Sequence, residues 1–89
     1  MHDQRQATSA EVEDLRDEMA VLTHVLVTHP GVLRLPDLLR ELGHPEDFGE
    51  RDRTERAVAS LIRTGLLFRC QDAVLPTRSA LRAYEVLSS

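Results

Sequence analysis

The chain has 89 residues, which is enough for one small domain with a single modest core and too few for an enzyme built from two lobes around a deep cleft. Hydrophobic residues make up 42% of the sequence, so a folded chain is expected. The net charge of −4 argues against nucleic acid as a partner unless cations gather on one face, and all eleven basic residues are Arg, a bias that a GC-rich genome explains without any function.

The first expected element is a long helix. It follows a polar, unpatterned tail over residues 1–8 that is predicted to be disordered. The helix is predicted over residues 9–29, with Ser9 as its N-cap. Its apolar residues recur at intervals of three and four, the seam spacing of a coiled coil, at Val12, Leu15, Met19, Leu22 and Leu26. A helix of 20 residues spans about 30 Å, which is longer than a small core. We therefore predict dimerisation through Val12, Leu15, Met19 and Leu22. Packing of this stripe on the chain's own domain is the alternative.

The acidic residues around that stripe look like a solvated flank that also favours the helix N-terminus. Beyond the helix, Pro30 and Gly31 predict its end, and residues 32–34 form a short extended segment. A second helix is predicted over residues 36–42, opened by Pro36 and stopped by Gly43. Residues 44–52 form a polar loop, in which Phe48 is expected to anchor the loop to the core.

The third helix is predicted over residues 52–64, with an apolar stripe from Ala57 to Ile62 and Gly65 as its stop. A β-hairpin over residues 66–76 follows, turning at Gln71 and Asp72, and Cys70 on it is expected to be a small core residue. A last helix over residues 77–87 is capped by Thr77. These elements make a mainly α fold with a small β-hairpin, in the α+β class.

The run ERAVASLIRTGLL resembles the third helix and first wing strand of a winged helix-turn-helix domain. The run AVLPTRSALRAYEVL, which follows it after a short turn, resembles the closing part of small, poorly characterised winged-helix proteins of GC-rich bacteria. The resemblance covers residues 20–87. It implies a single winged-helix domain over residues 9–89, with an extended N-terminal helix and a C-terminal helix. In that family the third helix usually enters the DNA major groove, and the wing contacts the backbone or the minor groove.

The resemblance therefore implies a DNA-binding surface on the third helix and the wing. Arg can pair with guanine or hold phosphate, and Ser and Gln can bond to either. The residues implied are Arg53, Arg56, Ser60, Arg63, Arg69 and Gln71. We expect a transcription regulator that binds double-stranded DNA as a homodimer. The alternative is a winged-helix module that binds another protein and no nucleic acid, because acidic residues surround the start of the third helix.

Catalysis, metal binding and membrane insertion are not expected. His24, His29 and His44 lack the spacing of paired metal ligands, and no acid or base is placed to activate Cys70 or a serine. We predict no enzyme activity, no cofactor and no metal. A lone cysteine and the lack of a signal peptide or a membrane-length apolar run indicate a cytoplasmic protein.

Overall fold

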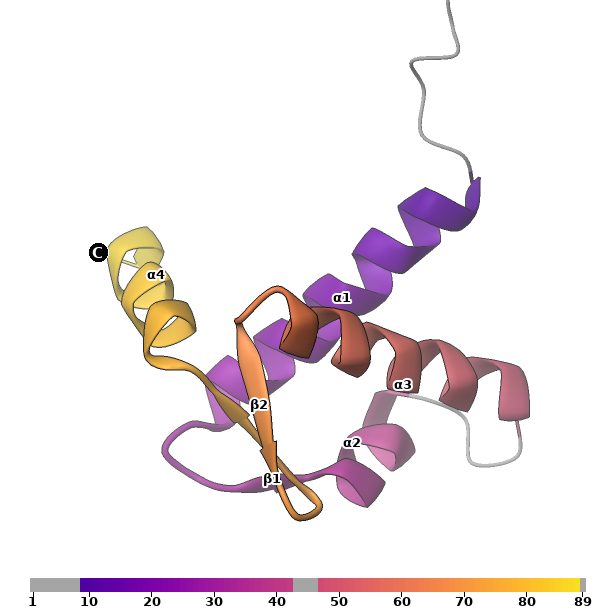
Figure 1. The fold of residues 1–89 in the computed structure, drawn as a ribbon. Coiled ribbons are helices and arrows are strands. Elements are labelled where there is room, and N and C mark those ends of the chain that lie inside the picture. The colour runs from indigo at the N-terminus through magenta and orange to yellow at the C-terminus, as the bar shows by residue number, and fades with distance from the viewer. Residues whose placement is uncertain (1–8, 43–46, 89) are drawn as a thin grey trace, which may run out of the picture.

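The computed structural model describes residues 9–42 and 47–88. The expected tail, the expected helix stop at Gly43 and the loop residue His44 lie outside these ranges. The described residues form four helices and three short strands, a mainly helical α+β arrangement (Figure 1). The elements are α1 (Ser9–Thr28), β1 (Leu33–Arg34), α2 (Leu35–Leu42), α3 (Phe48–Arg63), β2 (Leu67–Cys70), β3 (Ala73–Pro76) and α4 (Arg78–Ser88).

The three strands form one antiparallel sheet in the order β1-β3-β2. The hairpin pairs Leu67 with Pro76 at its open end and Cys70 with Ala73 beside its turn. The segment expected to be merely extended adds a third strand, because Leu33 pairs with Val74 on the other edge of β3. The sheet therefore ties the end of α1 to the hairpin that follows α3.

One core joins the helices to the sheet. Val21 and Val25, four residues apart on α1, are 1% and 2% exposed, so they define the face of α1 that packs inward. Leu22 is partly buried and packs against the same core. The same cluster includes Leu33, Leu38, Ala57, Val58, Leu61, Leu67 and Val74. The α4 helix adds the buried Ala80. Because the inward face of α1 is set by Val21 and Val25, the coiled-coil seam lies to one side of it.

The third helix begins earlier than predicted. It starts at Phe48, where the Asp47 side chain caps it by accepting a hydrogen bond from the Glu50 N–H at 3.1 Å. The prediction of a polar loop was therefore wrong over residues 48–52, and only residues 43–47 separate α2 from α3. The expected burial of Phe48 was also wrong, since the side chain is 78% exposed on the first turn of the helix.

Local signals set the other end of this helix and the start of the next. Gly65 adopts φ 85°, and the N–H groups of Gly65 and Leu66 donate to the carbonyls of Ile62 and Leu61, which closes the C-terminus of α3. Thr77 Oγ1 accepts from the Ala80 N–H at 3.2 Å, which confirms Thr77 as the cap of α4. Cys70 is exposed, so its assignment to the core was wrong.

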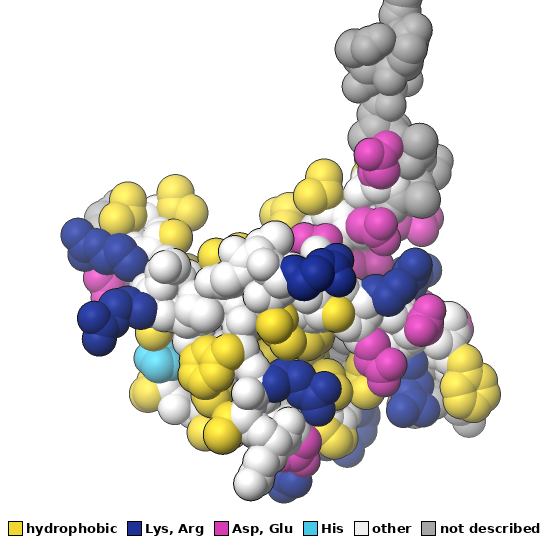
Figure 2. Space-filling model, in the orientation of Figure 1, with side chains coloured by type: hydrophobic (Ala, Val, Ile, Leu, Met, Phe, Trp, Pro, Cys, Tyr) yellow, Lys and Arg dark blue, Asp and Glu magenta, His cyan; other side chains and the backbone are white. Residues whose placement is uncertain are grey.

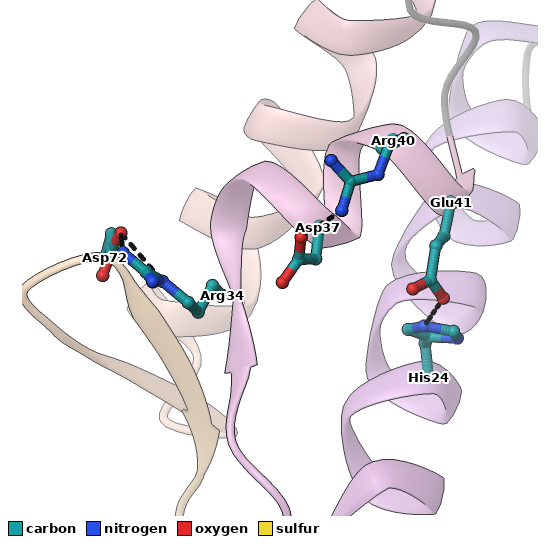
Figure 3. Close-up of polar contacts among 6 residues, drawn as sticks. All are labelled: His24, Arg34, Asp37, Arg40, Glu41 and Asp72. Carbon is teal, nitrogen blue, oxygen red and sulfur yellow. Dashed lines mark hydrogen bonds and ion pairs between the residues drawn. The ribbon is translucent and has the colours of Figure 1, made fainter.

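Ion pairs connect the elements around this core (Figure 3). His24 Nε2 on α1 lies 2.5 Å from Glu41 Oε1 on α2, so this histidine connects the two helices. Arg34 on β1 reaches Asp72 in the hairpin turn, with 2.6 Å between Nη2 and Oδ2. No helix in the described part of the chain is both long enough and apolar enough to cross a membrane.

Candidate nucleic-acid interface

The exposed face of α3 lies on the side of the helix away from its buried stripe. Thr54, Ala57, Val58 and Leu61 turn inward, and the Thr54 hydroxyl donates to the Glu50 carbonyl within the helix. Three of the predicted DNA contacts occur at intervals of four and three residues and share one outward side: Arg56, Ser60 and Arg63. Arg56 and Arg63 are exposed, and Ser60 is half-buried. The structure thus brings these three together.

Arg53 lies on the flank of α3 that faces α1. Its Nε donates to Asp17 Oδ2 at 3.3 Å, and the two side chains are 42% and 20% exposed. Asp17 belongs to a groove between α1 and α3 that has carboxylates on one side and guanidinium groups on the other. The charged residues that line it are Asp14, Asp17, Glu18, Arg53, Arg56 and Arg63.

The acidic flank of α1 is therefore not simply solvated, as the sequence suggested. Asp17 is mostly buried against α3, and Asp14 and Glu18 line the same groove. Their spacing of three and four residues could have indicated a shared helix face, but it did not indicate which element they would meet. A phosphate approaching Arg53 would have to compete with Asp17.

Acids also interrupt the outward face of α3. Asp52 Oδ2 lies 3.8 Å from Arg56 Nε, and both side chains are largely exposed. Asp52 lies one turn inside the helix, whose N-terminus is capped by Asp47 and carries Glu50 in its first turn. Figure 2, which views α3 and the hairpin from the front, shows Arg side chains separated by acidic and hydrophobic ones. The cations on this face form a broken row and not a continuous basic patch.

The hairpin contributes its residues on the other side of α3. Arg69 on β2 is exposed and lines a hollow with Glu55, Ala59 and Ile62, so it does not share the groove that holds Arg53. Gln71 occupies the turn with φ 58° and an exposed side chain. The predicted contacts therefore lie on two sides of α3, those of the helix beside α1 and those of the hairpin on the other side.

The tip of the hairpin carries the ion pair between Arg34 and Asp72. Hydrogen bonds from Arg34 lower the pKa of the Asp72 carboxyl below its ordinary value, and the same contact raises the pKa of Arg34 (Figure 3). The Asp72 carbonyl also accepts from the Leu35 N–H at 2.7 Å. These bonds hold the tip against the start of α2.

The predicted dimer residues divide into two groups. Val12, Leu15 and Met19 are 43%, 60% and 68% exposed on the projecting half of α1. Leu22 is partly buried and packs against the chain's own core, and its role in dimerisation stays a prediction. The stripe that remains is short and lies outside the core.

A metal ion needs several His, Cys, Asp or Glu side chains arranged around one point. No group of three or more such side chains among the described residues is placed to hold one. His24 pairs with Glu41, and His44 lies outside the described ranges.

Comparison of the chain with models of protein families, with curated proteins and with solved structures gives no match in any of the three.

Proposed function

We propose that the chain is a winged-helix protein that binds double-stranded DNA through α3 and the hairpin. The carrying observation is the outward side of α3, where Arg56, Ser60 and Arg63 are aligned opposite the buried stripe, next to a hairpin that exposes Arg69. The order of the elements, with a short strand before α2 and a hairpin after α3, is the order expected of a winged helix. Regulation of transcription by a homodimer is the role that such a protein would have.

The charge pattern makes this a weak and salt-sensitive contact. Arg53 pairs with Asp17 and Arg56 lies near Asp52, so each cation that grips a phosphate must leave or share a carboxylate. The Arg63 side chain is exposed, although it lines the groove that Asp14, Asp17 and Glu18 also line. Arg56 and Arg63 are therefore the cations that the proposal assigns to phosphate or base contact.

The test is a salt titration of binding to a mixed-sequence duplex with the full chain. Arg56→Ala with Arg63→Ala should weaken binding and lower the slope of log K against log salt by about two, because each phosphate contact contributes about 0.9. The matched control, Arg78→Ala with Arg82→Ala, removes the same charge from α4. An equal loss in both double variants, or no loss in the first, contradicts the assignment.

A protein-binding module is the second candidate, and exposed aromatic side chains favour it. Phe48 at the start of α3 and Phe68 on β2 are 78% and 45% exposed, and acids lie between the arginines of α3. Aromatic residues are enriched at protein interfaces. A chain that binds no duplex at low salt and whose Phe68→Ala variant loses a protein partner would favour this candidate.

A further inference from the structure

Two helices project from the body on the same side and leave apolar side chains in solvent. The first half of α1 and the end of α4 diverge from the core (Figure 1), and hydrophobic side chains gather on both (Figure 2). On α4, Tyr84 and Leu87 are 40% and 85% exposed. Their spacing from the buried Ala80 puts all three on one side of the helix. This side of α4 starts at the buried Ala80 and becomes more exposed toward Leu87.

Both projecting segments gain from being covered. A helix as short as α4, with 11 residues, is marginal in water unless tertiary packing supports it. The core buries its Ala80, close to its first turn, and leaves Leu87 in solvent. The first half of α1 has the same arrangement in reverse, with the exposed Leu15 and Met19 preceding the buried Val21. Both segments therefore carry apolar side chains that the core of their own chain leaves exposed.

Charge indicates which segments can cover each other. Residues 11–18 of α1 hold five carboxylates and one guanidinium, a balance of −4. Two such segments packed side by side would bring like charges together, which is destabilising. The α4 helix holds Arg78, Arg82 and Glu85, a balance of +1. An α1 segment against an α4 segment thus joins apolar side chains without that repulsion.

We propose that two copies of the chain associate with the first half of α1 of each copy packed against α4 of the other. In a two-fold dimer this contact is made twice, so the exposed apolar side chains of both segments are covered in both copies. Leu15 and Met19 of one copy lie against Tyr84 and Leu87 of the partner subunit. The inference rests on the proposed function, because it specifies which surfaces form the proposed homodimer. In this dimer α1 packs against α4 of the other copy and not against the other α1.

Cross-linking between two single-cysteine variants tests the pairing. Both variants carry Cys70→Ser, which removes the native exposed thiol. The full chain with Leu15→Cys is mixed with the full chain with Leu87→Cys under mild oxidation, so a disulfide between the two introduced residues joins α1 of one copy to α4 of another. We expect a covalent dimer in the mixture and little with either variant alone. Both positions are exposed, and circular dichroism checks that the fold is kept.

Sedimentation supplies a second, independent readout. Leu87→Asp should raise the dimer dissociation constant about tenfold or more, because it buries a charge in an apolar contact. Val32→Asp places the same charge at a 64% exposed apolar position outside the two segments and should leave the constant unchanged.

Three results would overturn the inference: a covalent dimer formed by Leu15→Cys alone, no covalent dimer in the mixture, or a wild-type chain that stays monomeric at high concentration. These measurements contain no DNA. Loss of the salt-dependent duplex binding with cross-linking intact would instead contradict the DNA proposal and leave the pairing in place.

Discussion

Removal of one carboxylate from α1 should raise the affinity of α3 for DNA while it lowers the stability of the fold. The carboxylate is Asp17, whose Oδ2 accepts from Arg53 Nε at 3.3 Å and whose side chain is 20% exposed. Asp17→Asn keeps the size of the side chain and removes its charge. Arg53 then becomes available to phosphate, and the negative potential beside α3 is reduced.

The magnitude follows from the exposure of the pair. The Arg53 side chain is 42% exposed, so solvent screens the interaction, and exposed ion pairs contribute about 0.2–1 kcal/mol. The free energy of unfolding should fall by no more than about 1 kcal/mol. In the wild type, Arg53 must give up its ion pair with Asp17 before it can bind phosphate. Without that cost of about 0.2–1 kcal/mol, DNA affinity should rise about 1.4- to 5-fold.

The assay is fluorescence anisotropy with a mixed-sequence duplex at low salt, where the effect is largest. Glu13→Gln is the matched control, because it changes the net charge equally on the same helix at a residue that does not line the groove between α1 and α3. An Asp17→Asn variant that binds no more tightly than Glu13→Gln would refute the reasoning that Asp17 competes with DNA for Arg53.

Three further substitutions test the fold that holds this site. Leu38→Ala should lower the free energy of unfolding by about 2–5 kcal/mol in urea titrations, because Leu38 is 0% exposed, whereas Val32→Ala at an exposed site should change it by less than about 0.5 kcal/mol. Gly65→Ala should cost about 1–2 kcal/mol through backbone conformation alone, since φ is +85° and an added Cβ meets nothing within 4 Å; a neutral result would contradict this. The pKa of Asp72 is lowered in the fold, so its ionised carboxylate stabilises the fold at pH values above the unfolded-state pKa. This stabilisation is lost as the pH falls through the folded-state pKa. Asp72→Asn should therefore lower the melting temperature at neutral pH and match the wild type in acid. A deficit that persists in acid would assign the effect to something other than the charge paired with Arg34.

Helix ends were predictable where the signal is local. Gly65 and Thr77 act on their own backbone neighbours, so the stop of α3 and the cap of α4 could be predicted from the sequence. The start of α3 could not, because Phe48 to Asp52 shows no apolar period, and the Asp47 cap lies before a polar turn. Phe48 was assigned to the core from its residue type, but its place on the first turn points it into solvent.

The outward face of α3 was predictable from the sequence, but the residues that surround it were not. The spacing of Arg56 and Arg63 identifies a common helix face, which the structure retains. Which carboxylates lie near that face depends on how α1 is rotated about its axis, and this rotation is fixed by burial of Val21 and Val25. Long-range packing of this kind leaves no local pattern, and the pairing of β1 with β3 escaped prediction for the same reason.

The first helix carries three overlapping stripes with the same spacing of three and four residues. One is the core stripe of Val21 and Val25, one is the acidic stripe that includes Asp17, and one is the exposed apolar stripe that includes Leu15 and Met19. Periodicity alone does not show which of the two apolar stripes faces the core, because either could be the buried face of an amphipathic helix. The fold ranks them by burying the first, turning the second toward α3 and leaving the third in solvent. Substitutions on α1 therefore separate the two proposals more cleanly than substitutions on α3, since Asp17→Asn tests the proposed DNA binding and Leu15→Cys tests the proposed association.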